Sequence, residues 1–290
     1  MAVWCFGSIN VDLFYDVPHI PAPGETLAAR SMFRGLGGKG ANQSVASAKA
    51  GVETHHIGAI GPDSDWVIER LESYGVDTSH IAVLDTPTGH AVINVAVDGE
   101  NAIVILPGAN AAQSVDRLEA ALVSASAGDI LLLQNEANLQ VEGAQAAKAR
   151  GMRAVYSAAP FDADAVEAIL PHIDMLLLNE IEAAQLETSL GKTLYELDVP
   201  QIVITLGAKG ARLIDTRSGD AFEVPGHKVD VVDTTGAGDT FAGYLAAGLA
   251  EGTPPQQAME FAGRAAALKV TRKGTADAIP SRAEVEAFLP

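Results

Sequence analysis

Residues 231–241 offer the clearest chemistry in the chain, with the sequence Val-Val-Asp-Thr-Thr-Gly-Ala-Gly-Asp-Thr-Phe. This glycine-rich stretch leads into an apolar run, residues 241–249, that predicts a helix. The first amides of a helix lack intrahelical acceptors and the helix dipole adds positive charge there, so a helix start can bind an anion. Gly236 and Gly238 would let a phosphate approach the backbone closely. The pattern predicts an anion site at this helix start.

Asp239 would lie in the first turn of the same helix, beside the anion site. A bound phosphate repels a carboxylate, which favours a chemical role for this one. The natural role is a general base that takes the proton from a hydroxyl attacking a phosphoryl group. The helix dipole alone also favours an aspartate in a first turn, so simple capping remains an alternative for this motif taken by itself.

The elements that must position these residues form an alternating pattern. Residues 2–9 predict a buried strand whose carboxyl end presents Asn10 and Asp12 on one side. From residue 114 onward helices and strands alternate, and runs such as Ile130-Leu131-Leu132-Leu133 are typical of parallel strands buried on both faces. The polar residues that follow these later strands are Glu136, Asn179, Glu180, Glu182, Thr205, Gly207, Lys209 and Gly210. Ligands of open α/β sheets bind at the carboxyl ends of strands, so a site is expected there, although each residue alone could be a cap or turn.

The fold class that follows is α/β, a three-layer α/β/α sandwich with a mostly parallel central sheet. Two strand-rich excursions interrupt it, with a strand-like piece at 26–33 and a hairpin whose strands, about 91–97 and 102–106, flank Asp98-Gly99. We expect these excursions to pair into a small β-sheet lid. The predicted division is a core of residues 1–12, 36–86 and 109–290 and a lid of residues 13–35 and 87–108.

Gly35, Gly37 and Gly40 also match the spacing of a dinucleotide-binding fingerprint, so an NAD-binding oxidoreductase is a second candidate. That fingerprint requires an acidic residue at the end of the next strand, and the predicted strand 54–60 ends without one. A helix start bearing Lys39 and Asn42 suits a polar, hydroxylated ligand equally well.

Composition excludes several other classes. The 290 residues carry a formal net charge of -18, from 37 Asp and Glu against 19 Lys and Arg, which argues against nucleic-acid binding. The single cysteine, Cys5, excludes an intrachain disulfide and fits a reducing compartment. With no basic N-terminal region and no apolar run long enough to span a bilayer, we expect a soluble, cytoplasmic protein without membrane partners.

Several motifs together resemble the ribokinase family of carbohydrate kinases, also called the PfkB family. The motifs occur in family order at residues 7–12, 37–43, 88–89, 99–101, 108–110, 179–182, 205–207, 233–241 and 270–274. The resemblance covers nearly the whole chain. It implies an ATP-dependent kinase that phosphorylates a primary hydroxyl of a pentose, with the 5-hydroxyl of D-ribose as the first expectation.

The resemblance also implies site residues. Asp239 would be the general base, and the backbone of Gly236, Ala237 and Gly238 would form an anion hole for the transferred phosphoryl group. The residues expected to hold the sugar are Asn10, Asp12, Gly38, Lys39, Asn42, Glu136 and Asp239. The residues expected to line the nucleotide are Asn179, Thr205, Gly207, Lys209, Gly210 and Gly238.

Two ions and one partner follow from the same resemblance. Glu182 would help to position Mg²⁺, through water. K⁺ would lie behind the anion hole, held by the Asp233 carboxylate and by the backbone carbonyls of Thr235, Lys269, Arg272 and Gly274. This chain has Ala278 where the family usually has a serine in the cation loop, and Gly263 where a polar side chain often lies beside adenine. A homodimer through the β lid is expected.

Three alternatives remain beside the ribose kinase. Within the family, the substrate could be another sugar, a sugar acid or a nucleoside. Outside it stand the NAD-binding oxidoreductase and a non-catalytic sugar-binding relative. Asp239 with its glycine anion hole argues against the last, because a binding protein needs no base.

Overall fold

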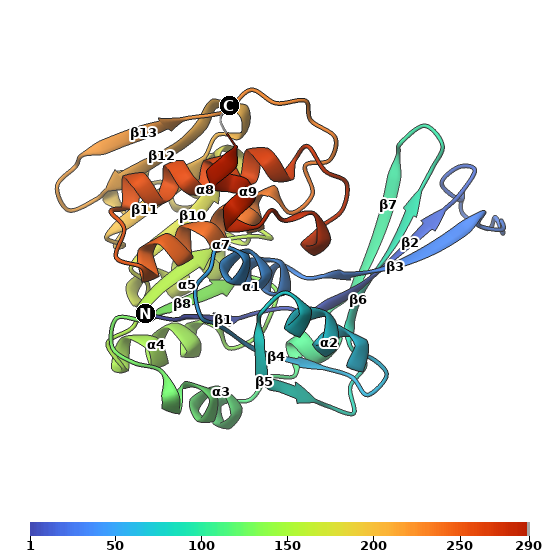
Figure 1. The fold of residues 1–290 in the computed structure, drawn as a ribbon, viewed down its shortest axis with the longest axis horizontal. Helices are drawn as coiled ribbons and strands as arrows, with labels where there is room; N and C mark the ends of the chain where they lie inside the picture. Colours follow the sequence, from blue (N-terminus) through green and yellow to red (C-terminus); the bar gives the residue numbers. More distant parts are fainter. Residues whose placement is uncertain (289–290) are drawn as a thin grey trace.

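A nine-stranded sheet forms the centre of the molecule and carries helices on both faces (Figure 1). The computed structural model describes residues 1–288; residues 289–290, the end of the predicted core segment, lie outside the described residues. The strand order is β13-β12-β11-β10-β9-β8-β1-β4-β5. The strands, in chain order, are β1 (Val3–Phe6), β4 (Thr54–Ile60), β5 (Asp77–Val83), β8 (Ile130–Gln134), β9 (Arg153–Ser157), β10 (Met175–Asn179), β11 (Gln201–Thr205), β12 (Gly210–Asp215) and β13 (Ala221–Pro225). Among the residues described, β12 pairs antiparallel with both β11 and β13, and the other neighbouring strands of this sheet pair parallel.

Two apolar clusters fill the space between the sheet and its helices, one on each face. Along β8, Ile130 and Leu132 belong to one cluster and Leu131 and Leu133 to the other, because successive strand residues point to opposite faces. The first cluster is completed by α1 (Lys39–Lys49), α2 (Asp65–Ser73), α7 (Ala237–Ala250), α8 (Pro255–Lys269) and α9 (Arg282–Ala287). The second is completed by α3 (Val115–Ala121), α4 (Gln140–Ala149), α5 (Ala163–Ile169) and α6 (Glu180–Leu190). The predicted three-layer sandwich is confirmed.

The direction of the chain across the sheet reverses between β1 and β8. From β1 the chain adds β4 and β5 on one side, and it later returns to add β8 to β11 on the other. Such a switch point opens a crevice at the carboxyl ends of the two central strands, where ligands of open α/β sheets bind. The residues after β1 and after β8 are therefore placed to share one site.

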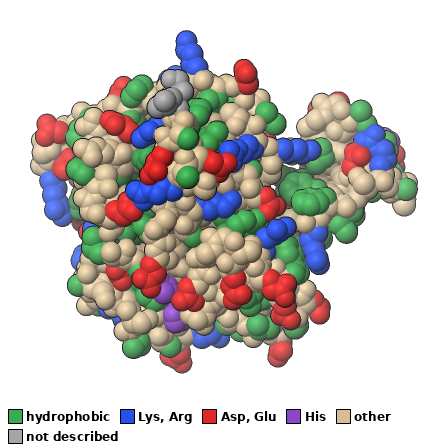
Figure 2. Space-filling view, viewed as in Figure 1, with side chains coloured by type: hydrophobic (Ala, Val, Ile, Leu, Met, Phe, Trp, Pro, Cys, Tyr) green, Lys and Arg blue, Asp and Glu red, His purple; other side chains and the backbone are tan. Residues whose placement is uncertain are grey.

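A second sheet of four strands projects from this core (Figure 1). It has the order β3-β2-β6-β7 and consists of β2 (Asn10–Asp16), β3 (Ser31–Gly37), β6 (Gly89–Val95) and β7 (Asn101–Leu106). The predicted hairpin is confirmed as β6 and β7, which pair antiparallel. Large apolar side chains on this sheet are exposed, among them Met32, Phe33, Ile103, Val104, Ile105 and Leu106. Figure 2 shows apolar side chains on the projecting part of the molecule.

Three sequence predictions differ from the structure. The predicted strand 2–9 ends at Phe6, and Asn10 and Asp12 belong to β2 of the smaller sheet. The strand-like piece predicted at 26–33 is observed as Ser31–Gly37. The dinucleotide-binding alternative is wrong, because Gly35 and Gly37 lie in this antiparallel strand and not in a loop between a parallel strand and a helix.

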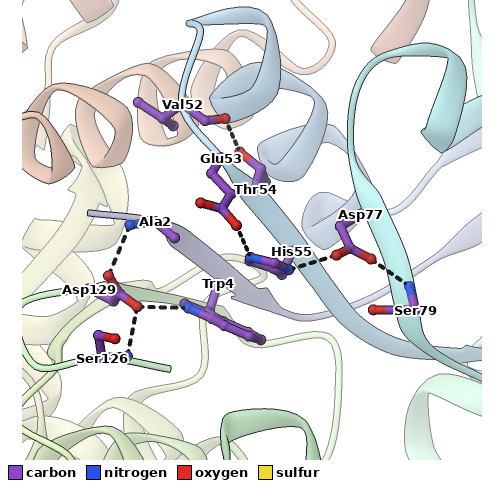
Figure 3. A network of polar contacts seen from close by, with 10 residues as sticks. All are labelled: Ala2, Trp4, Val52, Glu53, Thr54, His55, Asp77, Ser79, Ser126 and Asp129. Carbon is purple, nitrogen blue, oxygen red and sulfur yellow. Dashed lines mark hydrogen bonds and ion pairs between the residues drawn. The ribbon is translucent and has the colours of Figure 1, made fainter. Parts of the chain in front are cut away.

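The amino ends of the central strands are tied together on the side opposite the carboxyl ends (Figure 3). The Asp129 carboxylate accepts hydrogen bonds from the Ala2 amide at 2.9 Å, the Trp4 indole at 3.1 Å and the Ser126 amide at 2.9 Å. The Trp4 ring stacks on His55, with 4.0 Å between ring centroids. This network joins β1, β4 and β8 away from the predicted site, and we assign it a structural role. Within residues 1–288, no helix combines the length and apolar character that crossing a membrane requires.

Candidate active site

Asp239 lies in the first turn of α7 with its side chain only 8% exposed. Two side chains from α1 hold its carboxylate: Asn42 Nδ2 donates to Oδ2 and Gln43 Nε2 donates to Oδ1, each at 3.0 Å. The two helices approach closely because a Cβ on Gly243 would lie 2.5 Å from the Cβ of Ala46. Asp239 is therefore a buried carboxylate with a fixed orientation.

Within residues 1–288, the start of α7 has backbone amides without hydrogen-bond acceptors, as the sequence predicts. Gly236 is the N-cap residue and has a left-handed backbone, with a φ of 73°. No side chain of the described residues caps the helix. The Ala237 amide donates to the carbonyl of Thr234 at 3.2 Å. The amides of Gly236 and Gly238 have no such backbone acceptor among the described residues. Since the dipole adds positive charge here, the free amides suit an anion beside Asp239.

Asn10 and Asp12 reach the site from β2. The Asn10 side chain is held by Asn110, whose Nδ2 donates to Asn10 Oδ1 at 2.8 Å. The opposite end of the Asn110 amide accepts from the Ile9 amide at 2.9 Å, which fixes its orientation. A Cβ on Gly37 would lie 2.1 Å from the Asp12 carboxylate, so this position in β3 requires glycine. Both side chains are buried, and that of Asn10 is held by a hydrogen bond.

Glu136 bridges the switch point between β1 and β8. Its Oε2 accepts hydrogen bonds from the Lys39 amide at 3.0 Å and from the Ser8 hydroxyl. Gly38 precedes Lys39 as the N-cap of α1. These contacts bring the predicted sugar residues of β2, α1 and the β8 loop into one cluster next to Asp239.

The charges in this cluster are coupled. Burial raises the pKa of Asp12 from 3.8 to about 7, and the nearby Glu136 carboxylate adds to the rise. Burial lowers the pKa of Lys39, but the carboxylates of Asp239, Glu136 and Glu182 outweigh it, so the net shift is upward. Lys39 therefore remains an ammonium among several carboxylates at neutral pH.

Two cavities continue from Asp239 along the carboxyl ends of the strands. The smaller, about 190 Å³, is lined by polar groups that include Lys39, Asn179, Glu182 and Asp239. The larger, about 450 Å³, is mostly apolar, and its lining includes Gly207, Gly210, Ala211, Val224, Gly263 and Ala266. Thr205, Gly238 and Phe241 line both cavities, so the two are adjacent. The arrangement suits a ligand with a charged end at Asp239 and a flat apolar end.

The residues at the start of α6 form a capping box. Asn179 Oδ1 accepts from the amides of Ile181 and Glu182, and Glu182 Oε2 accepts from the Asn179 amide at 2.8 Å. Burial raises the pKa of Glu182 despite that hydrogen bond and the nearby Lys39 charge. Lys209 lies apart: its exposed ammonium pairs with Glu180 at 3.3 Å, and it is absent from the lining of both cavities.

The predicted K⁺ ligands also gather in one place, but two of the five, the Asp233 carboxylate and the Lys269 carbonyl, already accept hydrogen bonds. The Asp233 carboxylate accepts from the amides of Thr235 and Gly274, each at 2.9 Å. The carbonyl of Lys269 accepts from the Arg272 amide at 2.9 Å. The Lys269 ammonium donates to the carbonyl of Asp233 at 3.0 Å, and the side chain is 0% exposed. K⁺ would add a second positive charge beside a buried ammonium, so these residues do not fit it.

The sequence reasoning missed four side chains that position the site, and one charge. The positioning residues are Ser8, Gln43, Asn110 and Gln134. Ser8, Gln43 and Asn110 fall within the family motifs, and this was the available signal. The charge is the Lys269 ammonium, which the sequence prediction counted only for its carbonyl. It follows four apolar residues, Ala265 to Leu268, at the end of α8, and a charged residue in an apolar helical run was its signal.

Comparisons with known proteins agree with this geometry. A sequence model described as pfkB family carbohydrate kinase matches residues 2–282. The chain is 38% identical to a ribokinase of Haemophilus influenzae, over 98% of this chain and 96% of that protein. It is 31% identical to a deoxyribokinase of Salmonella typhi, over 100% and 99%. The solved structure of Arabidopsis thaliana ribokinase complexed with ribose and ATP superposes with a TM-score of 0.86 at 30% identity, covering 99% of this chain and 97% of that one. The chain therefore belongs to the pfkB family of carbohydrate kinases.

Proposed function

We propose that this protein is an ATP-dependent ribokinase that phosphorylates the 5-hydroxyl of D-ribose. The observation that carries the proposal is the position of the Asp239 carboxylate, which lies between the polar cluster around Asn10 and Glu136 and the cavity at the start of α7. The relatives named ribokinase, and the relative solved with ribose and ATP, support the choice of substrates.

In the proposed reaction the sugar lies among Asn10, Asp12, Lys39, Asn42 and Glu136. These side chains offer donors and acceptors to a polyol, and burial makes each unpaired group costly. The 5-hydroxyl faces Asp239, which accepts its proton while the hydroxyl oxygen forms a bond to the γ-phosphorus. The bond from that phosphorus to the bridging oxygen of ADP breaks in the same transfer, and ADP leaves. The amides of Gly236 and Gly238 stabilise the charge on the transferred group.

The two cavities fit ATP. The polar cavity accommodates the phosphates near Lys39, and the apolar one accommodates adenine. A Cβ built on Gly263 meets no atom within 4 Å, which leaves open space for a ring. Thr205, Gly207 and Gly210 lie along this path, and Lys209 acts at most at its outer rim through its charge.

Mg²⁺ is part of the proposal because the donor set fits it. Mg²⁺ prefers carboxylate oxygens, phosphates and retained water, and the carboxylates of Glu182 and Asp239 line the polar cavity. Glu182 would hold it through water. When bound, the ion would neutralise negative charge on the phosphates. The K⁺ that the family resemblance implies is left out, because the residues around Asp233 do not fit it.

The smaller sheet acts in this proposal as a lid, formed by residues 13–35 and 87–108. Its exposed apolar residues on β3 and β7 need cover, and a second copy of the same sheet would supply it. We therefore propose a homodimer through the lid, in the cytoplasm where ATP is supplied.

A substrate panel tests the proposal. The purified protein is assayed for ADP release with D-ribose, 2-deoxyribose, fructose, gluconate and adenosine, and the product position is read by ³¹P and ¹³C NMR. Because a site built to pair a hydroxyl discriminates strongly against analogues that lack it, D-ribose should give the highest kcat/KM, with phosphate on its C5 oxygen. A higher kcat/KM for another acceptor would overturn the ribose assignment and leave the family membership intact.

A further inference from the structure

Lys269 is a fully buried charged residue. It is the last residue of α8, and its side chain is 0% exposed. Charged side chains are almost never fully buried unless they are paired, because their desolvation is costly. Its Nζ donates to the carbonyl of Asp233 at 3.0 Å. Burial lowers the pKa of Lys269, and the Asp233 and Asp239 carboxylates oppose this, which indicates that both negative charges are near.

Asp233 connects this ammonium to the site. It begins the segment that ends at Asp239. Its carboxylate accepts hydrogen bonds from the amides of Thr235 and Gly274. The loop after α8 is tied in turn to the sugar side, because the Thr275 hydroxyl donates to the carbonyl of Leu36 at 2.9 Å. The Lys269 ammonium, which donates to the Asp233 carbonyl, therefore holds the segment that carries the anion-binding glycines.

We propose that the Lys269 ammonium is a tethered cation that takes the place of K⁺ behind the anion site, so that neither folding nor phosphoryl transfer needs a monovalent metal ion. A charge held in the low-dielectric interior acts without reorganisation and is lost only with the side chain. Lys269 is a positioning residue here, because it acts through the Asp233–Asp239 segment and does not touch the substrate. The inference rests on the proposed kinase function for its kinetic part and on the fold alone for its stability part.

The first experiment uses the wild-type protein. Initial rates with ribose, ATP and Mg²⁺, and the thermal unfolding midpoint without ligands, are measured in KCl, NaCl and choline chloride at equal ionic strength. Rates within about 2-fold of one another and equal midpoints are expected, since the cation is built in. A several-fold activation specific to K⁺, or a rise of the midpoint specific to K⁺, would overturn the proposal. If the protein shows no ribose kinase activity in any salt, the proposed function fails. The unfolding midpoints still test whether Lys269 takes the place of K⁺ in stabilising the fold.

The second experiment removes the charge. Lys269→Met keeps most of the volume and Lys269→Ala leaves space for an ion; Lys273→Met, in the exposed part of the same loop, is the control. For Lys269→Met we expect kcat to fall about 10- to 100-fold with the ribose KM changed little, below the roughly 10²–10³-fold cost of removing a direct oxyanion donor. In Lys269→Ala, K⁺ should restore rate better than choline. Wild-type kcat in Lys269→Met would contradict the proposal. If a variant fails to fold, the salt series on the wild-type protein still tests the proposal, because that experiment needs no variant.

Discussion

The side-chain amide of Gln43 donates a hydrogen bond to Asp239 Oδ1 at 3.0 Å, which restricts rotation of the carboxylate. The orientation of the amide is itself set, because Gln134 Nε2 donates to Gln43 Oε1 at 2.8 Å. Two glutamines from α1 and β8 thus connect the centre of the core to the proposed base. Since both lie behind Asp239 and away from the cavities, their role is to position the carboxylate.

Gln43→Met should therefore lower kcat without a matching change in substrate binding. Methionine fills a similar volume and donates no hydrogen bond, so Asp239 keeps only the Asn42 donor and gains freedom to rotate. We expect kcat to fall about 10- to 100-fold, since misplacement of a catalytic group by about 1 Å can cost 10²-fold. Steady-state kinetics check this, with Gln145→Met on the exposed side of α4 as the matched control. Equal kcat in both variants would sink the positioning role of Gln43.

The raised pKa of Asp12 predicts a pH dependence on the acid side. Below about pH 7 the free enzyme holds this carboxyl protonated, so it accepts fewer hydrogen bonds from sugar hydroxyls. The kcat/KM for ribose should therefore rise as pH rises through about 7 and then level off. Because kcat/KM reports groups of the free enzyme, the profile from pH 5.5 to 8.5 measures it. Asp12→Asn should have a lower kcat/KM and no step near pH 7; a step that persists there would assign it to another group.

The exposed strand β7 predicts a dimer that one charge disrupts. Val104 is 70% exposed in the middle of an apolar run. Val104→Asp places a charge where a second lid would pack, so the dimer should dissociate to monomers in light scattering at micromolar concentration. The control is Val123→Asp, at a valine that lies outside the lid and is 78% exposed. A wild-type protein of monomer mass, or a Val104→Asp variant that stays dimeric, would speak against the interface.

The hydrogen-bond network of Asp129 at the amino ends of the strands should contribute to the free energy of unfolding and not to kcat. Asp129→Ala leaves the Trp4 indole and the Ala2 and Ser126 amides without their acceptor. Leaving one buried donor unpaired costs about 1–3 kcal/mol, so urea unfolding should show a loss of at least about 2 kcal/mol. The kcat measured below the unfolding transition should equal that of the wild type. A large fall in kcat in the folded variant would show that this end of the sheet influences the site.

The sequence was informative wherever a function depends on local pattern. The glycines and Asp239 fall in one continuous stretch, so the helix start and its acid could be predicted from residues 231–241 alone. The continuous apolar run of residues 130–133 likewise predicted a buried parallel strand, and the sheet confirms it. Both inferences needed only neighbouring residues.

The remaining features depend on contacts between distant segments. The strand predicted at 2–9 breaks after Phe6 because Gly40 packs on the backbone of Gly7 and Ser8, where a Cβ would lie 2.6 Å away. The lid joins β2 to β6 in parallel, pairing Asn10 with Gly89, and no local pattern specifies that register. Whether the Lys269 side chain would turn inward toward Asp233 or outward to water could not be read from its own helix.

The central claim is that Asp239 takes the proton of the ribose 5-hydroxyl. Asp239→Asn keeps the shape of the side chain and removes its ability to accept a proton, so it tests this claim directly. The measurement is the single-turnover rate of ribose phosphorylation with enzyme in excess over ATP, together with calorimetric Kd values for ribose and ATP. The account predicts a rate at least about 10²- to 10⁴-fold below the wild type with both Kd values within a few-fold. A folded variant that phosphorylates ribose at a near-normal rate would contradict it.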